Sequence, residues 1–115
     1  MKEFKIEFCL ADSEFMTAVR LAVGAVCSAA NLDVDSSEDM KVCVTEGCLI
    51  LKGCGFENAQ IVLKAEGGFV AQIAGVGGQA KFCDNEFSLA LVSALLSSVE
   101  IERHNEAIYK LTLTL

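Results

Sequence analysis

The sequence lacks proline and tryptophan, and it has one histidine and one tyrosine among 115 residues. Without proline, long helices and strands can run without a fixed break. No apolar run approaches the roughly 18 uncharged residues that a membrane-spanning helix needs. The N-terminal run MKEFKIEFCL alternates charged and apolar residues, which predicts a strand and not a signal peptide. We therefore expect no membrane partner.

Basic residues are also scarce. The chain has nine Lys and Arg residues and sixteen Asp and Glu residues, which gives a net charge of −7. Nucleic-acid binding needs clustered cations to neutralise phosphates, and here the basic residues are scattered. The composition argues against nucleic acid and favours a protein partner.

Six cysteines raise the possibility of disulfides or zinc, but no C-x-x-C pair occurs and most lie in apolar segments. The single histidine, His104, lies in a polar turn far from them in sequence. The prediction is no metal site, and reduced thiols that act as small buried hydrophobes in a cytoplasmic protein. The six are Cys9, Cys27, Cys43, Cys48, Cys54 and Cys83.

Hydrophobic residues make up 53 % of the chain, enough for one domain over residues 1–115 with a core of its own. Periodicity predicts a strand over 3–10, a helix from Asp12 or Ser13 to Asn31, and a second helix capped by Ser36 with Asp39 and ending near Lys52. Two strands joined by EGG follow, then a helix over 88–98 and a final hairpin with HNE in its turn. The expected fold is α+β, a two-layer sandwich whose mixed, mostly antiparallel sheet carries three helices on one face.

The second helix should bury one stripe against the sheet and carry Val42, Glu46, Leu49 and Ile50 on its other side. An acid at helical spacing among apolar residues is either the remnant of a polar site or an ordinary acid at a solvent-exposed helix edge, and we favour the second interpretation of Glu46. The stripe expected to face the sheet consists of Met40, Cys43, Val44, Gly47, Cys48 and Leu51.

Three runs in order, SEFMTAVR, EDMKVCVTEGC and LSSVEI, resemble the anti-sigma factor and serine-protein kinase family. That family belongs to the histidine-kinase-like ATPases of the GHKL superfamily, which share the Bergerat fold. The resemblance implies that Glu46 matches the acid that activates a hydroxyl or water. It also implies that Ile50 replaces the Asn that holds Mg²⁺, and isoleucine has no atom that can bind a hard cation.

The resemblance covers two further motifs. In IAGVGGQ, Gly75 stands where the family has the Asp that accepts the adenine amino group, and Gly77 and Gly78 match the glycine-rich loop. A glycine-rich loop alone is a weak phosphate signal, so we favour a strand-end turn for these glycines. In DNEFSLAL, Glu86 and Ser88 replace the glycine pair that cradles phosphates, and Glu86 would repel them. The lid between these motifs is also short. ATP and Mg²⁺ are therefore expected only if this degenerate site still binds them.

Arg20 matches an arginine with which the family touches its protein partner, and an ordinary exposed helix arginine is the alternative. The leading hypothesis is a non-catalytic, anti-sigma-like regulator that binds a sigma factor or an anti-anti-sigma-like antagonist, with a homodimer possible. The alternatives are an active ATP-dependent serine-protein kinase with a rewired site, in which Glu46 is catalytic, and a small-molecule sensor that uses the emptied pocket. Without a nucleotide, either the short loop collapses over Val42, Leu49 and Ile50, or another protein covers them. We favour the collapse, with Phe82 as the plug.

Overall fold

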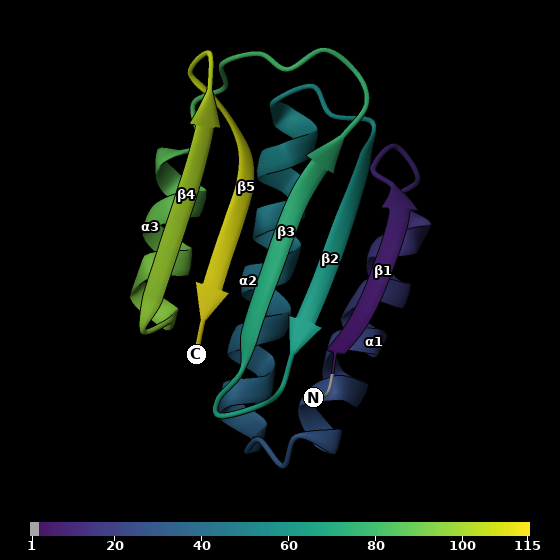
Figure 1. Ribbon diagram of the computed structural model, residues 1–115, viewed down its shortest axis with the longest axis vertical. Helices are drawn as coiled ribbons and strands as arrows, with labels where there is room; N and C mark the ends of the chain where they lie inside the picture. The colour runs from purple at the N-terminus through teal and green to yellow at the C-terminus, as the bar shows by residue number, and fades with distance from the viewer. Residues whose placement is uncertain (1–2) are drawn as a thin grey trace.

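Five strands and three helices follow one another in the predicted order in the computed structural model, which describes residues 3–115 (Figure 1). Their bounds are β1 Glu3–Cys9, α1 Glu14–Ala29, α2 Val34–Gly53, β2 Asn58–Lys64, β3 Val70–Val76, α3 Glu86–Leu95, β4 Ser98–His104 and β5 Ala107–Thr114. Within residues 3–115, no helix has both the length and the hydropathy needed to cross a membrane.

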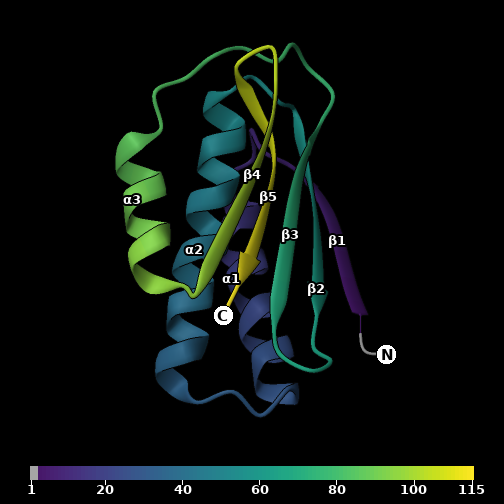
Figure 2. The same cartoon turned by 60° about the vertical axis from the view of Figure 1, so that its left-hand side comes forward.

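The strands form one sheet in the order β1-β2-β3-β5-β4, and all three helices cover the same face (Figure 2). This confirms the α+β two-layer sandwich. All four strand pairings are antiparallel, so the expected mixed sheet is wrong. The reason is that the chain reverses direction at every connection (Figure 1), which makes β3 and β5 antiparallel although α3 and β4 separate them in sequence.

The core lies between the sheet and the helices. In β2, Ala59, Ile61 and Leu63 are fully buried, and their neighbours Ile73 and Leu111 in β3 and β5 continue the apolar face. The alternate residues of each strand point to the open face of the sheet, because side chains alternate along a strand. This alternation fixes the register of the sheet.

The N-cap of the central helix, α2, lies three residues before the predicted cap Ser36. The side chain of Asp33 accepts a hydrogen bond from the Ser36 backbone N–H at 2.7 Å, so Asp33 is the N-cap. This bond keeps the pKa of Asp33 below its ordinary value. The predicted stripe of α2 is confirmed, since all six of its residues are buried against the sheet.

The last helix, α3, spans Glu86–Leu95 and not 88–98 as predicted. It starts earlier because the Asp84 carboxylate accepts a hydrogen bond from the Glu86 backbone N–H at 3.2 Å. It stops earlier because Leu96 is already extended, with φ −117° and ψ 158°, and leads into β4.

Candidate functional site

Glu46 lies half-buried on the outer side of α2, between α1 and α3. Its Oε2 atom accepts a hydrogen bond from the hydroxyl of Ser88 on α3 at 3.1 Å. Sequence analysis placed both residues at motif positions but did not predict this contact, which joins residues 42 apart. A carboxylate held this way is partly satisfied inside the protein and ties the start of α3 to the middle of α2.

The residue one turn after Glu46 does not share its surroundings. Ile50 is only 2 % exposed and belongs to the hydrophobic core, so its placement on the outer side of the helix is wrong. Val42 and Leu49, at 40 % and 47 % exposed, do lie on that outer side. The position that the resemblance assigns to the Mg²⁺ ligand thus lies in the hydrophobic core.

Arg20 reaches α2 from α1. Its Nε donates a hydrogen bond to the Thr45 hydroxyl at 3.2 Å, and that hydroxyl donates to the Lys41 carbonyl at 2.8 Å. Among residues 3–115, Thr45 is the one hydrogen-bond partner of the Arg20 side chain. The guanidinium has five N–H donors, so its two terminal amino groups remain available to a carboxylate.

Arg20 and Glu46 line one hollow, although 26 positions separate them in sequence. This hollow between α1 and α2 has a volume of about 280 Å³, and Val42 and Thr45 also form its wall. The arrangement combines a cation, an anion and an exposed aliphatic side chain, a mixture that suits contact with another protein.

Lys41 extends this hollow along the helix pair, and sequence analysis missed it. Its side chain crosses α1 at Gly24, where an added Cβ would lie 2.7 Å from Lys41 Cε, and its Nζ pairs with Glu38 at 3.0 Å. Glu38 and Lys41 also line a second hollow of about 500 Å³ that continues to the α1–α2 turn. A glycine in the middle of an amphipathic helix was the available signal, because such a glycine marks a close approach. We call the two hollows together the α1–α2 groove.

The glycines that match the adenine-binding motif lie at the end of β3, and a phenylalanine lies against the first of them. A Cβ on Gly75 would come within 2.4–2.7 Å of the Phe56 ring, so this ring fills the space that an Asp side chain would need. Phe56 follows α2 and packs against the core. The short loop does not supply the plug, since Phe82 is 64 % exposed and its predicted role is wrong.

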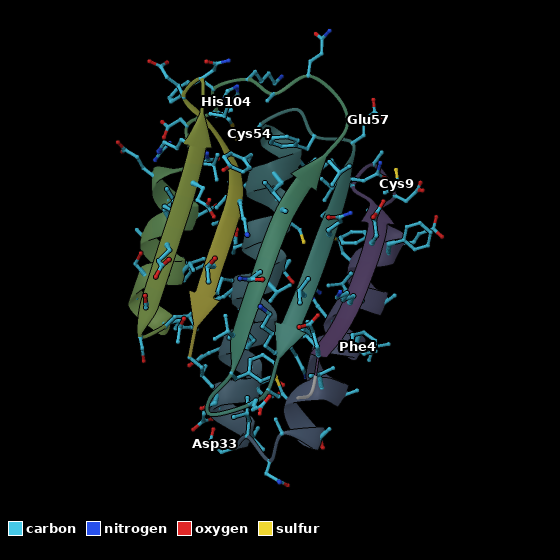
Figure 3. The ribbon with its side chains drawn as sticks, viewed as in Figure 1. Phe4, Cys9, Asp33, Cys54, Glu57 and His104 are labelled. Carbon is cyan, nitrogen blue, oxygen red and sulfur yellow. The ribbon has the colours of Figure 1, made fainter. Side chains whose placement is uncertain are left out.

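The next two glycines allow a tight turn. Gly77 and Gly78 both have φ near +75°, which side chains rarely adopt. A Cβ on Gly78 would lie 2.3 Å from the carbonyl oxygen of Gly55, so the loop runs directly against the turn after α2. Figure 3 shows this end of the molecule, with Cys54 and Glu57 labelled. Sequence analysis favoured a strand-end turn over a phosphate loop, and the close packing is consistent with that preference.

The start of α3, to which the resemblance assigns the phosphates, carries acids. Asp84 and Glu86 line a hollow of about 300 Å³ together with Phe82 and Arg103. Because the Asp84 carboxylate already occupies the Glu86 N–H, a phosphate there would meet two carboxylates and one arginine. This helix start is a poor anion site.

All six cysteines are free, and they all lie within residues 3–115. Burial raises the pKa of Cys43 to about 11 and that of Cys48 to about 12, which keeps both as neutral thiols. Within the described part of the chain, no group of three or more His, Cys, Asp or Glu side chains could hold a metal ion. The two cysteines that keep partial exposure are Cys9 and Cys83.

No protein-family model and no curated protein sequence matches the chain. The geometry of this site and the resemblance of its motifs are therefore the basis of the functional argument.

Proposed function

We propose that this protein is a non-catalytic regulator of the anti-sigma type, which binds a sigma factor or an anti-anti-sigma-like antagonist through the α1–α2 groove. The observation that supports this best is the shared hollow of Arg20 and Glu46. The resemblance separately pointed to one of these residues for partner contact and to the other for catalysis, and both face the same open surface.

The residues at the nucleotide-motif positions support the same proposal. Phe56 occupies the place of the adenine-binding Asp, and Ile50, in place of the Mg²⁺ ligand, lies in the core. Glu46 bonds Ser88, and the acids at the start of α3 repel phosphate. With adenine, metal and phosphate contacts all replaced, an active kinase is the weaker candidate.

The exposed residues of α1 favour a protein partner over a small-molecule sensor. Leu21 on α1 is 71 % exposed, and Val42 in the wall of the groove is 40 % exposed, so apolar side chains reach solvent there. A sensor would instead need a cavity beside Leu49 and Ile50, and Ile50 is enclosed by the core. Exposed apolar surface next to a charged groove is typical of protein contact.

We place this function in the cytoplasm, because buried neutral thiols such as Cys43 and Cys48 suit a reducing compartment. Nucleic acid is not an expected partner, given the net charge of −7.

Binding to purified sigma factors and anti-anti-sigma-like antagonists of the source organism, measured by calorimetry, tests the proposal. We expect one of them to bind the wild type, and Arg20→Ala to weaken binding about 30-fold, as for an arginine at the centre of an interface. Arg103→Ala is the matched control, because Arg103 is the other arginine and lies on β4. Equal binding by Arg20→Ala and the wild type, or no binding by any candidate, would contradict the proposal.

A further inference from the structure

Strand β1 forms one edge of the sheet. Its inner side pairs with β2 along its whole length, from Glu3 opposite Lys64 to Cys9 opposite Asn58. Among residues 3–115, no strand pairs with its outer side. Figure 3 shows Phe4 and Cys9 along this margin. A seven-residue edge strand with free backbone groups is a template for another strand.

We propose that β1 pairs antiparallel with β1 of a second copy, about a two-fold axis at Ile6, and joins two sheets into one. The sequence EFKIEFC is complementary to itself in this register. Phe4 lies opposite Phe8 of the second copy, and Lys5 lies opposite its Glu7. The symmetry repeats each pair, so four favourable cross-strand pairs flank the axis about Ile6.

The charges select this register over its neighbours. Lys5 and Glu7 both point to the open face. Lys5 is 71 % exposed and its Nζ pairs with Glu3 of its own strand at 3.2 Å, and Glu7 accepts a hydrogen bond from Gln60 of β2 at 2.7 Å. An axis at Lys5 would place Glu3 opposite Glu7, and an axis at Glu7 would place that residue opposite itself. Shifting the pairing by an even number of residues keeps the helix-facing side chains of both strands on the helix side of the joined sheet, and an odd shift does not. Of these three axes, the one at Ile6 pairs opposite charges. An axis at Phe4 would also place Glu3 opposite Lys5, but it would pair only Glu3, Phe4 and Lys5 among the residues of β1, whereas the axis at Ile6 pairs the whole strand.

Helix α1 supplies a second, independent surface at this margin. Arg20 and Gly24 face α2, and Val23 faces the sheet. At about 100° per residue, the flank turned away from α2 carries Phe15 and Val26, with small residues between and around them. No charged residue occurs between Arg20 and Asp33. The small residues on this flank are Ala18, Ala22 and Ala29.

The two-fold axis would bring the α1 helices of both copies together on the same side of the joined sheet, because each α1 packs over its own β1 (Figure 1). The alanines permit close approach of the two helices. The contact would also cover Phe4 and Phe15, which are 44 % and 45 % exposed in the single chain.

The other edge of the sheet does not suit self-pairing. In β4, an axis at Ile101 would place Glu100 opposite Glu102 twice, and the strand is irregular between Glu102 and Arg103. Like charges opposite each other and a bulge are the usual protections of an edge. The chain is thus built to close as a dimer through β1 and not to extend as a filament.

Sedimentation equilibrium of the full chain, with charge variants on β1, tests this proposal. We expect the wild type to be a dimer. Lys5→Glu and Glu7→Lys should each be monomeric, with dissociation constants raised at least about 30-fold, since each replaces two attractive pairs by two repulsive ones. Both positions face solvent, and circular dichroism checks that each variant is folded.

Two complementary samples make the test specific. The swap Lys5→Glu/Glu7→Lys should restore the dimer, and an equimolar mixture of the two single variants should form a heterodimer. Glu100→Lys on β4 is the matched control and should remain dimeric. A monomeric wild type, a swap that stays monomeric, or single variants as dimeric as the wild type would overturn the proposal, as would concentration-dependent growth beyond a dimer.

Discussion

The two flanks of α2 differ in what fills them. On the flank toward α3 and the end of β3, Phe56 lies against Gly75 and Ser88 bonds Glu46. On the flank toward α1, Arg20 and Lys41 border an open groove. The resemblance assigns the nucleotide to the first flank and a protein partner to the second. The comparison teaches that side chains alone can fill one flank of a helix and leave the other flank open, within one regular arrangement of helices and strands.

The largest effect is expected from adding a side chain to the filled flank. Gly75→Asp would drive a carboxylate into the Phe56 ring and should lower the free energy of unfolding by about 3 kcal/mol. Urea unfolding measures it, with Ala74→Asp as the control on the open face of the same strand. Adding Phe56→Ala should make the double variant more stable than the sum of the two single changes predicts. Simple additivity would show that the ring and Gly75 are not in contact.

A smaller effect is expected from the contact between α2 and α3. Ser88→Ala leaves the Glu46 carboxylate without its partner and should cost about 1 kcal/mol of unfolding free energy. Ser93→Ala, at an exposed position of the same helix, should change stability by less than about 0.5 kcal/mol. In a double-mutant cycle with Glu46→Ala, a coupling energy near zero would contradict the hydrogen bond.

Substitutions on the flank of α2 that faces α1 should change the stability of the protein little. Arg20→Ala removes one part-buried hydrogen bond, and the Thr45 hydroxyl keeps its bond to the Lys41 carbonyl. We therefore expect a loss of no more than about 0.5 kcal/mol in unfolding free energy. The same variant should bind its partner poorly. A stability loss as large as that of Gly75→Asp would show that Arg20 has a structural role and would remove it from the interface.

The smallest effect concerns pH at the end of the groove. The hydrogen bond from Ser36 keeps the pKa of Asp33 below its ordinary value of 3.8. The stability that Asp33 contributes is therefore fully present above pH 3.8 and is lost as the pH falls through its lower folded pKa. Melting temperatures of the wild type and Asp33→Asn should differ at pH 6 and converge toward pH 2. A constant difference over this range would contradict the cap.

The sequence was sufficient to predict the order of the elements and the buried stripe of α2, because both depend on local periodicity. It was insufficient for Ile50, which lies at the border between the two sides of α2. At such a border position, helical periodicity alone does not determine whether the side chain is buried. Packing against the other elements determines it. Phe56 was missed because the positive φ of Gly55, at 93°, sets the direction of the chain after α2.

The site residues show the same limit. Motif positions identified Glu46 and Arg20 separately, yet only the pairing of α1 with α2 places them in one hollow. The bond between Glu46 and Ser88 likewise depends on how α3 packs. The sequence identified these residues but could not predict which residues they contact in the folded protein.

Calorimetric titration of the full chain with ATP and ADP, with and without Mg²⁺, tests the central claim most directly. If the nucleotide flank is filled as described, no binding heat should appear up to millimolar nucleotide, whether or not Mg²⁺ is present. Submillimolar, Mg²⁺-dependent binding would contradict the account, and loss of phosphotransfer in Glu46→Ala would then identify an active kinase.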